Sequence, residues 1–186
     1  MVPVTALLLP ILISAAIVFI ASSIIHMVLK YHESDFGKVP SEDDVMDALR
    51  PFSIPPGDYV IPCGGSMEAL KDPEYIARTE KGPVAIVTVL PNGKQGMGGS
   101  LLLWFFYCIL VSIFAAYLTG RALEPGAHYL TVFRFAGTVA FAGHGLALLQ
   151  NSIWLKRAWS STIKSIFDAL IYALLTAGTF GWLWPE

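Results

Sequence analysis

The chain has 186 residues, of which 55% are hydrophobic and 14% are charged, and its formal net charge is -2. With a mean hydropathy of +0.61, this composition is typical of an integral membrane protein and not of a soluble domain. The small net charge and the lack of a large Lys/Arg cluster exclude a nucleic-acid-binding protein. The lipid bilayer is therefore the one partner that composition demands.

The first apolar run extends from Val4 to Leu29 and ends at Lys30. It provides the roughly 20 residues that a spanning helix needs. No basic segment precedes it, and it is longer than the core of a signal peptide, so we expect residues 1–30 to remain as an uncleaved anchor. Pro10 removes one backbone donor and predicts a bend in this helix.

Residues 31–99 are polar and rich in loops, and they are the only part able to form structure outside a bilayer. Ser41 and the acidic residues after it predict a short helix over Glu42 to Leu49, with the Ser41 hydroxyl as its cap. Prolines and glycines in residues 51–65 predict an ordered turn. Val84 to Leu90 predicts one strand, which must pair within this segment or with another chain.

A glycine-rich segment and two cysteines could indicate a phosphate-binding loop or a metal site, but neither has the spacing that such a site requires. The glycine-rich residues 93–100 follow the predicted strand, but they match neither the P-loop nor the dinucleotide-binding pattern, so we interpret them as a hinge. Cys63 and Cys108 lack CxxC spacing and fall in different surroundings. We expect two unpaired thiols, without a disulfide or a zinc site formed by cysteines.

Three further apolar segments predict spans at residues 100–120, 129–150 and 162–184, which form a helical domain over 100–186. Tryptophan and tyrosine side chains near their ends are typical of membrane interfaces. The connections between these spans are short, so neighbouring spans should be antiparallel. The expected fold class is an all-α integral membrane protein, with four transmembrane helices in a bundle and a small extramembrane segment.

Positively charged residues predict the orientation of the chain in the membrane, because they concentrate on the cytoplasmic side. The opposite side holds only Arg121 near a span. The residues that mark the cytoplasmic side are Lys30, Lys38, Lys94, Lys156, Arg157 and Lys164. We therefore expect an inner-membrane, multi-pass protein with segment 31–99 in the cytoplasm and both termini on the other side.

The third and fourth spans each have a polar face. Helical spacing places Arg134 and His144 on one arc of the third span, together with the small residues Gly137 and Gly145, and Val132 on the opposite arc. We expect the polar arc to face other helices. The fourth span has a similar face, formed by Lys164, Ser165, Asp168, Tyr172, Thr176 and Thr179.

Ionisable residues inside a membrane are costly unless they are paired or hydrated, so they are candidate functional residues. A rise of about 1.5 Å per residue places His26, His144 and Asp168 in one layer near the cytoplasmic side. Arg134 falls in a different layer, near the other side. The four residues His26, His144, Asp168 and Arg134 form the candidate intramembrane site.

The sequence leaves several roles open for these residues. Histidines and a carboxylate at one depth suit a metal ion, a haem held between His26 and His144, or a proton relay. Alternatively, they make ordinary packing contacts, with Lys164 one turn from Asp168 as its partner. No spacing typical of hydrolysis or phosphoryl transfer occurs. We therefore predict no cofactor, no metal ligand and no catalytic residue, and keep a haem or metal at His26 and His144 as the alternative.

The resulting functional hypothesis is a non-enzymatic accessory or regulatory subunit that acts through residues 31–99 and through helix packing. Its partners would be other membrane subunits or further copies of the chain. The alternative hypothesis is a membrane carrier, proton relay or haem/metal redox module that uses His26, His144, Asp168 and Arg134.

Overall fold

The computed structural model describes the whole chain, residues 1–186, as two compact units. The helical unit comprises residues 1–36 and 96–186, and the polar unit comprises residues 37–95. Residues 31–36 and 96–99, which the sequence analysis assigned to the polar segment, belong to the helical unit.

The helical unit contains four helices that are long and apolar enough to cross a membrane, as the sequence predicts. The first combines the 3-10 turn η1 (Val4–Leu7) with α1 (Leu8–Met27). The second is α4 (Gly98–Ala122). The third is α5 (Tyr129–His144), followed by the 3-10 turn η5 (Leu146–Leu148) and the short helix α6 (Leu149–Ile153). The fourth is α7 (Trp159–Trp182). The span predicted at 129–150 corresponds to this third helix, Tyr129–Ile153, in which a 3-10 turn interrupts the α-helical pattern after His144.

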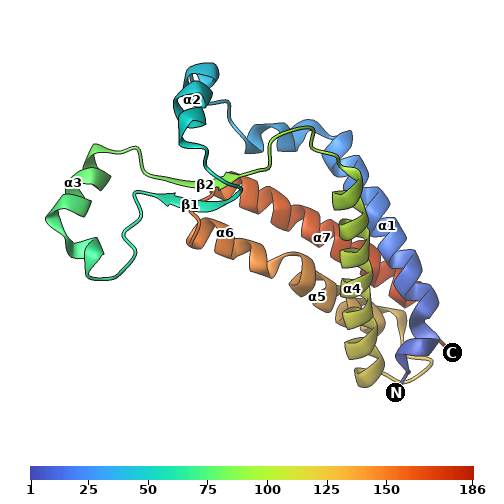
Figure 1. Cartoon of the computed structure of the whole chain (residues 1–186). Coiled ribbons are helices and arrows are strands. Elements are labelled where there is room, and N and C mark those ends of the chain that lie inside the picture. Colours follow the sequence, from blue (N-terminus) through green and yellow to red (C-terminus); the bar gives the residue numbers. More distant parts are fainter. The chain divides into compact units, whose positions relative to one another are not determined.

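The four long helices form a bundle in which each contacts two neighbours. Helix α1 contacts α4 and α7, and α5 contacts the same two helices (Figure 1). Small residues bring α5 and α7 close together. A Cβ atom on Gly137 would lie 3.0 Å from the methyl carbon of Ala177, and one on Gly145 would lie 3.1 Å from that of Ala169. The bundle therefore relies on small side chains at its closest interface.

The buried face of α5 differs from the predicted one in the first half of the helix. Val132, Ala136 and Ala140 are fully buried, whereas Arg134 is exposed. The prediction that Arg134 faces the other helices, and Val132 does not, is therefore wrong. The cause is the close approach of α5 to α7, which admits alanine and valine but has no room or hydrogen-bond partners for a guanidinium.

The two chain termini lie at one end of the bundle (Figure 1). The Met1 amino group pairs with the Glu124 carboxylate in the connection between α4 and α5. The backbone N–H of Val2 donates to the carbonyl oxygen of Gly120 over 2.8 Å. The Trp184 indole donates to the carbonyl oxygen of Glu124 over 3.0 Å. These contacts tie both termini to the α4–α5 connection.

The polar unit is built around a two-stranded antiparallel sheet. Strand β1 (Gly57–Ile61) pairs with β2 (Ala85–Val89), with Gly57 opposite Val89 and Ile61 opposite Ala85. The predicted strand at 84–90 is confirmed, and its partner lies within the same segment. The prediction of a turn throughout 51–65 is wrong, because five residues between the flanking prolines are extended.

Short helices complete the polar unit: α2 (Glu42–Leu49), the 3-10 turns η3 (Arg50–Phe52) and η4 (Ala69–Lys71), and α3 (Pro73–Lys81). Helix α2 matches its predicted bounds, but the predicted hydroxyl cap from Ser41 does not form. Helix α3, which the sequence analysis missed, begins where the Asp72 carboxylate accepts a 2.9 Å hydrogen bond from the Glu74 N–H. No hydrophobic side chain of this unit belongs to the buried core.

Candidate metal centre in the helical unit

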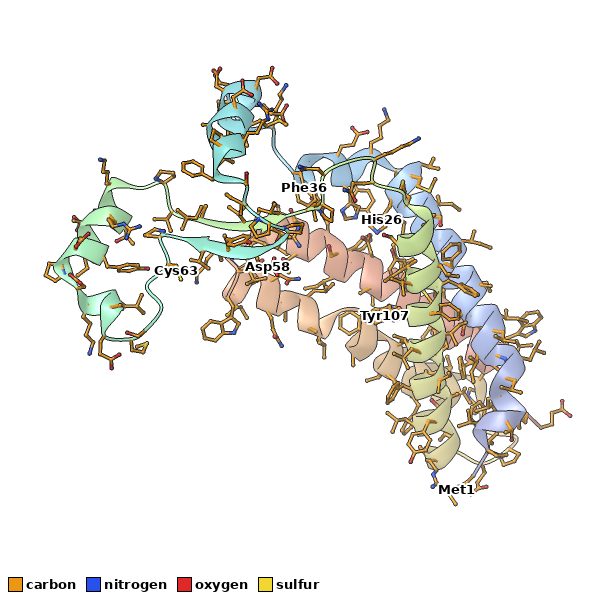
Figure 2. All side chains as sticks on the ribbon, in the orientation of Figure 1. Met1, His26, Phe36, Asp58, Cys63 and Tyr107 are labelled. Atoms are coloured by element: carbon orange, nitrogen blue, oxygen red, sulfur yellow. The ribbon has the colours of Figure 1, made fainter.

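A cluster of polar side chains forms where the chain leaves α1. The 3-10 turn η2 (Lys30–Asp35) follows α1 and packs against α7. It brings Tyr31 and His32 to Asp168, which lies 137 and 136 residues, respectively, further along the chain. His26, near the end of α1, lies at the opposite end of the bundle from Met1 (Figure 2).

Asp168 is the buried centre of this cluster, with 2% of its surface exposed. Its Oδ1 atom accepts a hydrogen bond from the Tyr31 hydroxyl, and its Oδ2 atom lies 2.7 Å from Nε2 of His32. Burial, and then the hydrogen bond to Asp168, raise the pKa of Tyr31 well above its ordinary value. Tyr31 therefore stays a hydrogen-bond donor to the carboxylate at neutral pH.

The second ring nitrogen of His32, Nδ1, lies 2.6 Å from Oδ2 of Asp35. Burial alone would raise the pKa of the Asp35 carboxyl. Hydrogen bonds from His32, Lys164 and Ser161 outweigh that effect and lower this pKa to about 2. Asp35 is therefore a fixed negative charge behind the imidazole.

Lys164 is the cation that fixes Asp35, the carboxylate behind the His32 ring. Its ammonium group lies 2.9 Å from Oδ1 of Asp35 and also donates to the Ser34 hydroxyl and to the Tyr31 carbonyl oxygen. The sequence offered Asp168, one turn away on the same helix, as an alternative partner for Lys164, but Lys164 pairs with Asp35 instead. The chain after α1 folds back within its reach and offers a carboxylate and two further acceptors.

His26 completes a group of three residues that are able to share a metal ion. Its ring centroid lies 4.6 Å from that of His32. One ligand atom from each of His26, His32 and Asp168 can be chosen so that all three lie within 4.8 Å of one another. Two imidazoles and a carboxylate are ligands that zinc and other divalent transition metals accept.

His26 and Asp168 also line a cavity of about 340 Å³ among the helices, and His144 lies in the same wall. His144 is 7% exposed, and its ring packs against those of Trp104, Tyr107 and Tyr172 at centroid distances of 6.0, 5.4 and 5.5 Å. The other lining residues are Leu148 and Ser165. Three of the four candidate residues from the sequence thus meet at one cavity, as their depths permit.

The fourth candidate, Arg134, does not join them, because its side chain is exposed on α5. Sequence reasoning also missed three members of the cluster, namely Tyr31, His32 and Asp35. One signal was available: His32 and Asp35 are spaced three residues apart directly after an apolar helix, so one turn places them side by side. Their positions outside the apolar run led us to treat them as part of a solvated loop.

The fold and the site define a class of protein, a bundle of four apolar helices with a histidine and carboxylate cluster where the chain leaves α1. Comparison with known protein families, with curated proteins and with solved structures finds no match to this chain.

Proposed function

We propose that the chain is a multi-pass protein of the inner cell membrane, with the polar unit in the cytoplasm and both termini on the opposite side. Four helices of sufficient length and apolarity support membrane insertion. The concentration of lysine and arginine beside the connections at 31–99 and 154–158 supports this orientation.

Within this setting, we propose that the protein binds one divalent transition-metal ion, such as Zn²⁺, through His26, His32 and Asp168. The supporting observation is the position of His32 between two carboxylates, 2.6 Å from Asp35 and 2.7 Å from Asp168. A neutral imidazole has one N–H and satisfies only one of them, whereas an imidazolium donates to both without a metal. A metal ion bound by Nε2 and by Asp168 is the other arrangement that satisfies the site, because Nδ1–H then donates to Asp35.

This arrangement has the layered construction of protein metal sites. A metal-bound histidine ordinarily donates its second ring N–H to a carboxylate, which fixes the ring and its tautomer. Asp35 provides that carboxylate, and Lys164 fixes Asp35 in turn. The Tyr31 hydroxyl donates a hydrogen bond to Asp168 and so fixes this proposed ligand. Three protein ligands leave a fourth position on a tetrahedral ion, and the adjoining cavity gives an exogenous ligand access to it.

Metal titration of the purified protein tests this proposal. After treatment with a chelator, the full-length protein in detergent is titrated with ZnCl₂ by calorimetry. We expect one site per chain, and at least about 100-fold weaker binding after His32→Ala or Asp168→Ala. His128→Ala, at the start of α5 and outside the cluster, is the matched control. Unchanged Zn²⁺ affinity in both cluster variants would overturn the proposal.

Two further measurements on the purified protein, an absorption spectrum and proton uptake, separate this function from the haem and proton-relay hypotheses. A haem between His26 and His144 predicts a Soret band in the purified protein, and its loss in His144→Ala. A proton relay through the cluster requires no metal and predicts proton uptake that His32→Ala abolishes. The Zn²⁺ site predicts neither signal and does not use His144 or Arg134 as ligands.

A second candidate function is that of an accessory or regulatory subunit, and one observation favours it. The polar unit exposes apolar side chains, among them Phe52 in η3 at 72% and Leu90 directly after β2 at 61%. The strand predicted at 84–90 does not require a partner from another chain, because β2 pairs with β1. Cross-linking and copurification from native membranes test it, and recovery of a lone monomer from both would contradict it.

A further inference from the structure

We propose that the cavity beside the cluster binds the ring of a membrane-soluble quinone, with its apolar tail in a second cavity between α1 and α4. This inference rests on the proposed membrane location but not on the metal site. Only binding is proposed, without electron transfer.

The wall of the first cavity suits a flat ring. Trp104, Tyr107, His144 and Tyr172 all contribute rings, and neighbouring rings pack with centroids 5.4 to 6.0 Å apart. Aromatic side chains favour stacked or edge-on contact with another ring. The volume of about 340 Å³ is at the lower end of the range for small-molecule sites.

Two residues in this wall have buried polar atoms without a hydrogen-bond partner. They are Nδ1 of His144 and the hydroxyl of Tyr172, and their residues are 7% and 4% exposed. Leaving such an atom unpaired is unfavourable, because folding has removed it from water without providing another partner. Four other polar groups of the wall, on Trp104, Tyr107, Ser165 and Asp168, already have hydrogen-bond partners. The Tyr107 hydroxyl donates to the Gly143 carbonyl oxygen, and the Trp104 indole donates to the Ser22 hydroxyl.

A second cavity, of about 310 Å³, adjoins the first and shares His26 and Trp104 with it. Its lining is mainly apolar and comes from the end of α1 and the start of α4, including Met27, Met97 and Leu101. This arrangement provides a path for a hydrocarbon chain along two apolar helices, which leads to the aromatic wall.

Charge distinguishes a quinone from other amphiphiles. A fatty acid would bring its carboxylate close to Asp168, and a phospholipid would require a free cation for its phosphate. Lys164, the cation of the cluster, is engaged by Asp35 and two other acceptors. A quinone is neutral and flat, and its carbonyl oxygens accept hydrogen bonds from a tyrosine hydroxyl and an imidazole N–H.

Tryptophan fluorescence provides the test, because quinones quench it and Trp104 lies in both cavities. The full-length protein, with its four other tryptophans replaced by phenylalanine, is freed of metal with a chelator and titrated with decylubiquinone in detergent. We expect saturable quenching, and about 5–10-fold weaker binding after Tyr172→Phe, which removes one hydrogen bond. Tyr117→Phe, on an exposed part of α4, is the matched control.

A second variant keeps the test valid if Tyr172→Phe does not fold. Ser100→Phe places a ring in the tail cavity from an exposed position on α4 and should also weaken quenching. Non-saturable quenching, or unchanged affinity in both variants, would overturn the proposal. Dodecanol has a tail but no ring. If dodecanol competed for the site as strongly as the quinone does, the proposal would also be overturned. The chelator makes the outcome independent of whether the metal proposal holds.

Discussion

Nε2 of His32 lies 2.7 Å from Oδ2 of Asp168 and joins the turn after α1 to α7 across 136 residues of sequence. Both side chains are largely shielded, with 14% and 3% exposed. This contact fixes how the turn lies on the bundle. If it were broken, water could not replace it, because both side chains are shielded from solvent. The cluster therefore contributes to stability as well as to the proposed metal site.

We first predict that Asp168→Ala destabilises the metal-free protein by about 2–4 kcal/mol, because it leaves Tyr31 and His32 without their buried acceptor. Asp168→Asn should have a smaller effect, since an amide oxygen still accepts a hydrogen bond. Unfolding by SDS titration in detergent micelles measures both changes. Glu33→Ala, whose side chain is 70% exposed, is the control. Equal stability of Asp168→Ala and the unchanged chain would contradict this prediction.

The second prediction concerns pH. The folded pKa of Asp35, about 2, lies below its ordinary value of 3.8, so folding favours the charged carboxylate. Its contribution to stability is therefore complete above about pH 5 and is lost as the pH falls through the ordinary pKa toward 2. The gap in melting temperature between the unchanged protein and Asp35→Asn should thus narrow from pH 6 to pH 3. A constant gap across this range would show that the charge of Asp35 is not what stabilises the fold.

The third prediction concerns Asp35, which supports the proposed ligand His32 but is not itself a proposed ligand. Asp35→Asn keeps His26, His32 and Asp168 in place but weakens the hold on the His32 ring. Loss of such an outer partner typically lowers metal affinity by about 10–100-fold. Zn²⁺ calorimetry at neutral pH should show this decrease with an unchanged stoichiometry of one. Full affinity in Asp35→Asn would indicate that Nδ1–H needs no carboxylate.

The number of apolar helices could be predicted from sequence because it depends on local composition. A run such as Val4 to Leu29 is predominantly apolar and is long enough to span a bilayer, whatever the rest of the chain does. The rotation of α5 could not be predicted in the same way. The outward position of Arg134 depends on how closely Gly137 lets α7 approach, which is a property of two helices and not of one.

The candidate site, like the fold, could be predicted from the sequence only in part. Depth along a helix follows from counting residues, and it grouped His26, His144 and Asp168, which line one cavity. The partners that complete the cluster, His32 and Asp35, depend on how the chain turns after α1. That turn is held by contacts with α7 that lie more than 120 residues away along the chain.

The fourth prediction tests the packing of the chain terminus on α4. A Cβ atom on Gly120 would collide with the backbone carbonyl oxygen of Val2. Val2 cannot move away without breaking the hydrogen bond from its N–H to the Gly120 carbonyl oxygen. Gly120→Ala should therefore lower stability by about 1–3 kcal/mol. Gly178→Ala is the matched control, because its added methyl group would meet only the Tyr129 hydroxyl at 3.8 Å. Equal melting temperatures for the two variants would rule out this contact.

The fifth prediction tests the proposed orientation with the two free cysteines. Cys63 is exposed in the polar unit and Cys108 is buried on α4, so only Cys63 should react with a membrane-impermeant maleimide. If the polar unit is cytoplasmic, intact cells will not be labelled, whereas inside-out membrane vesicles will be. Cys63→Ser should abolish labelling in both preparations. Labelling of Cys63 in intact cells would reverse the orientation, because the reagent reaches only the outer side and the polar unit would then lie there.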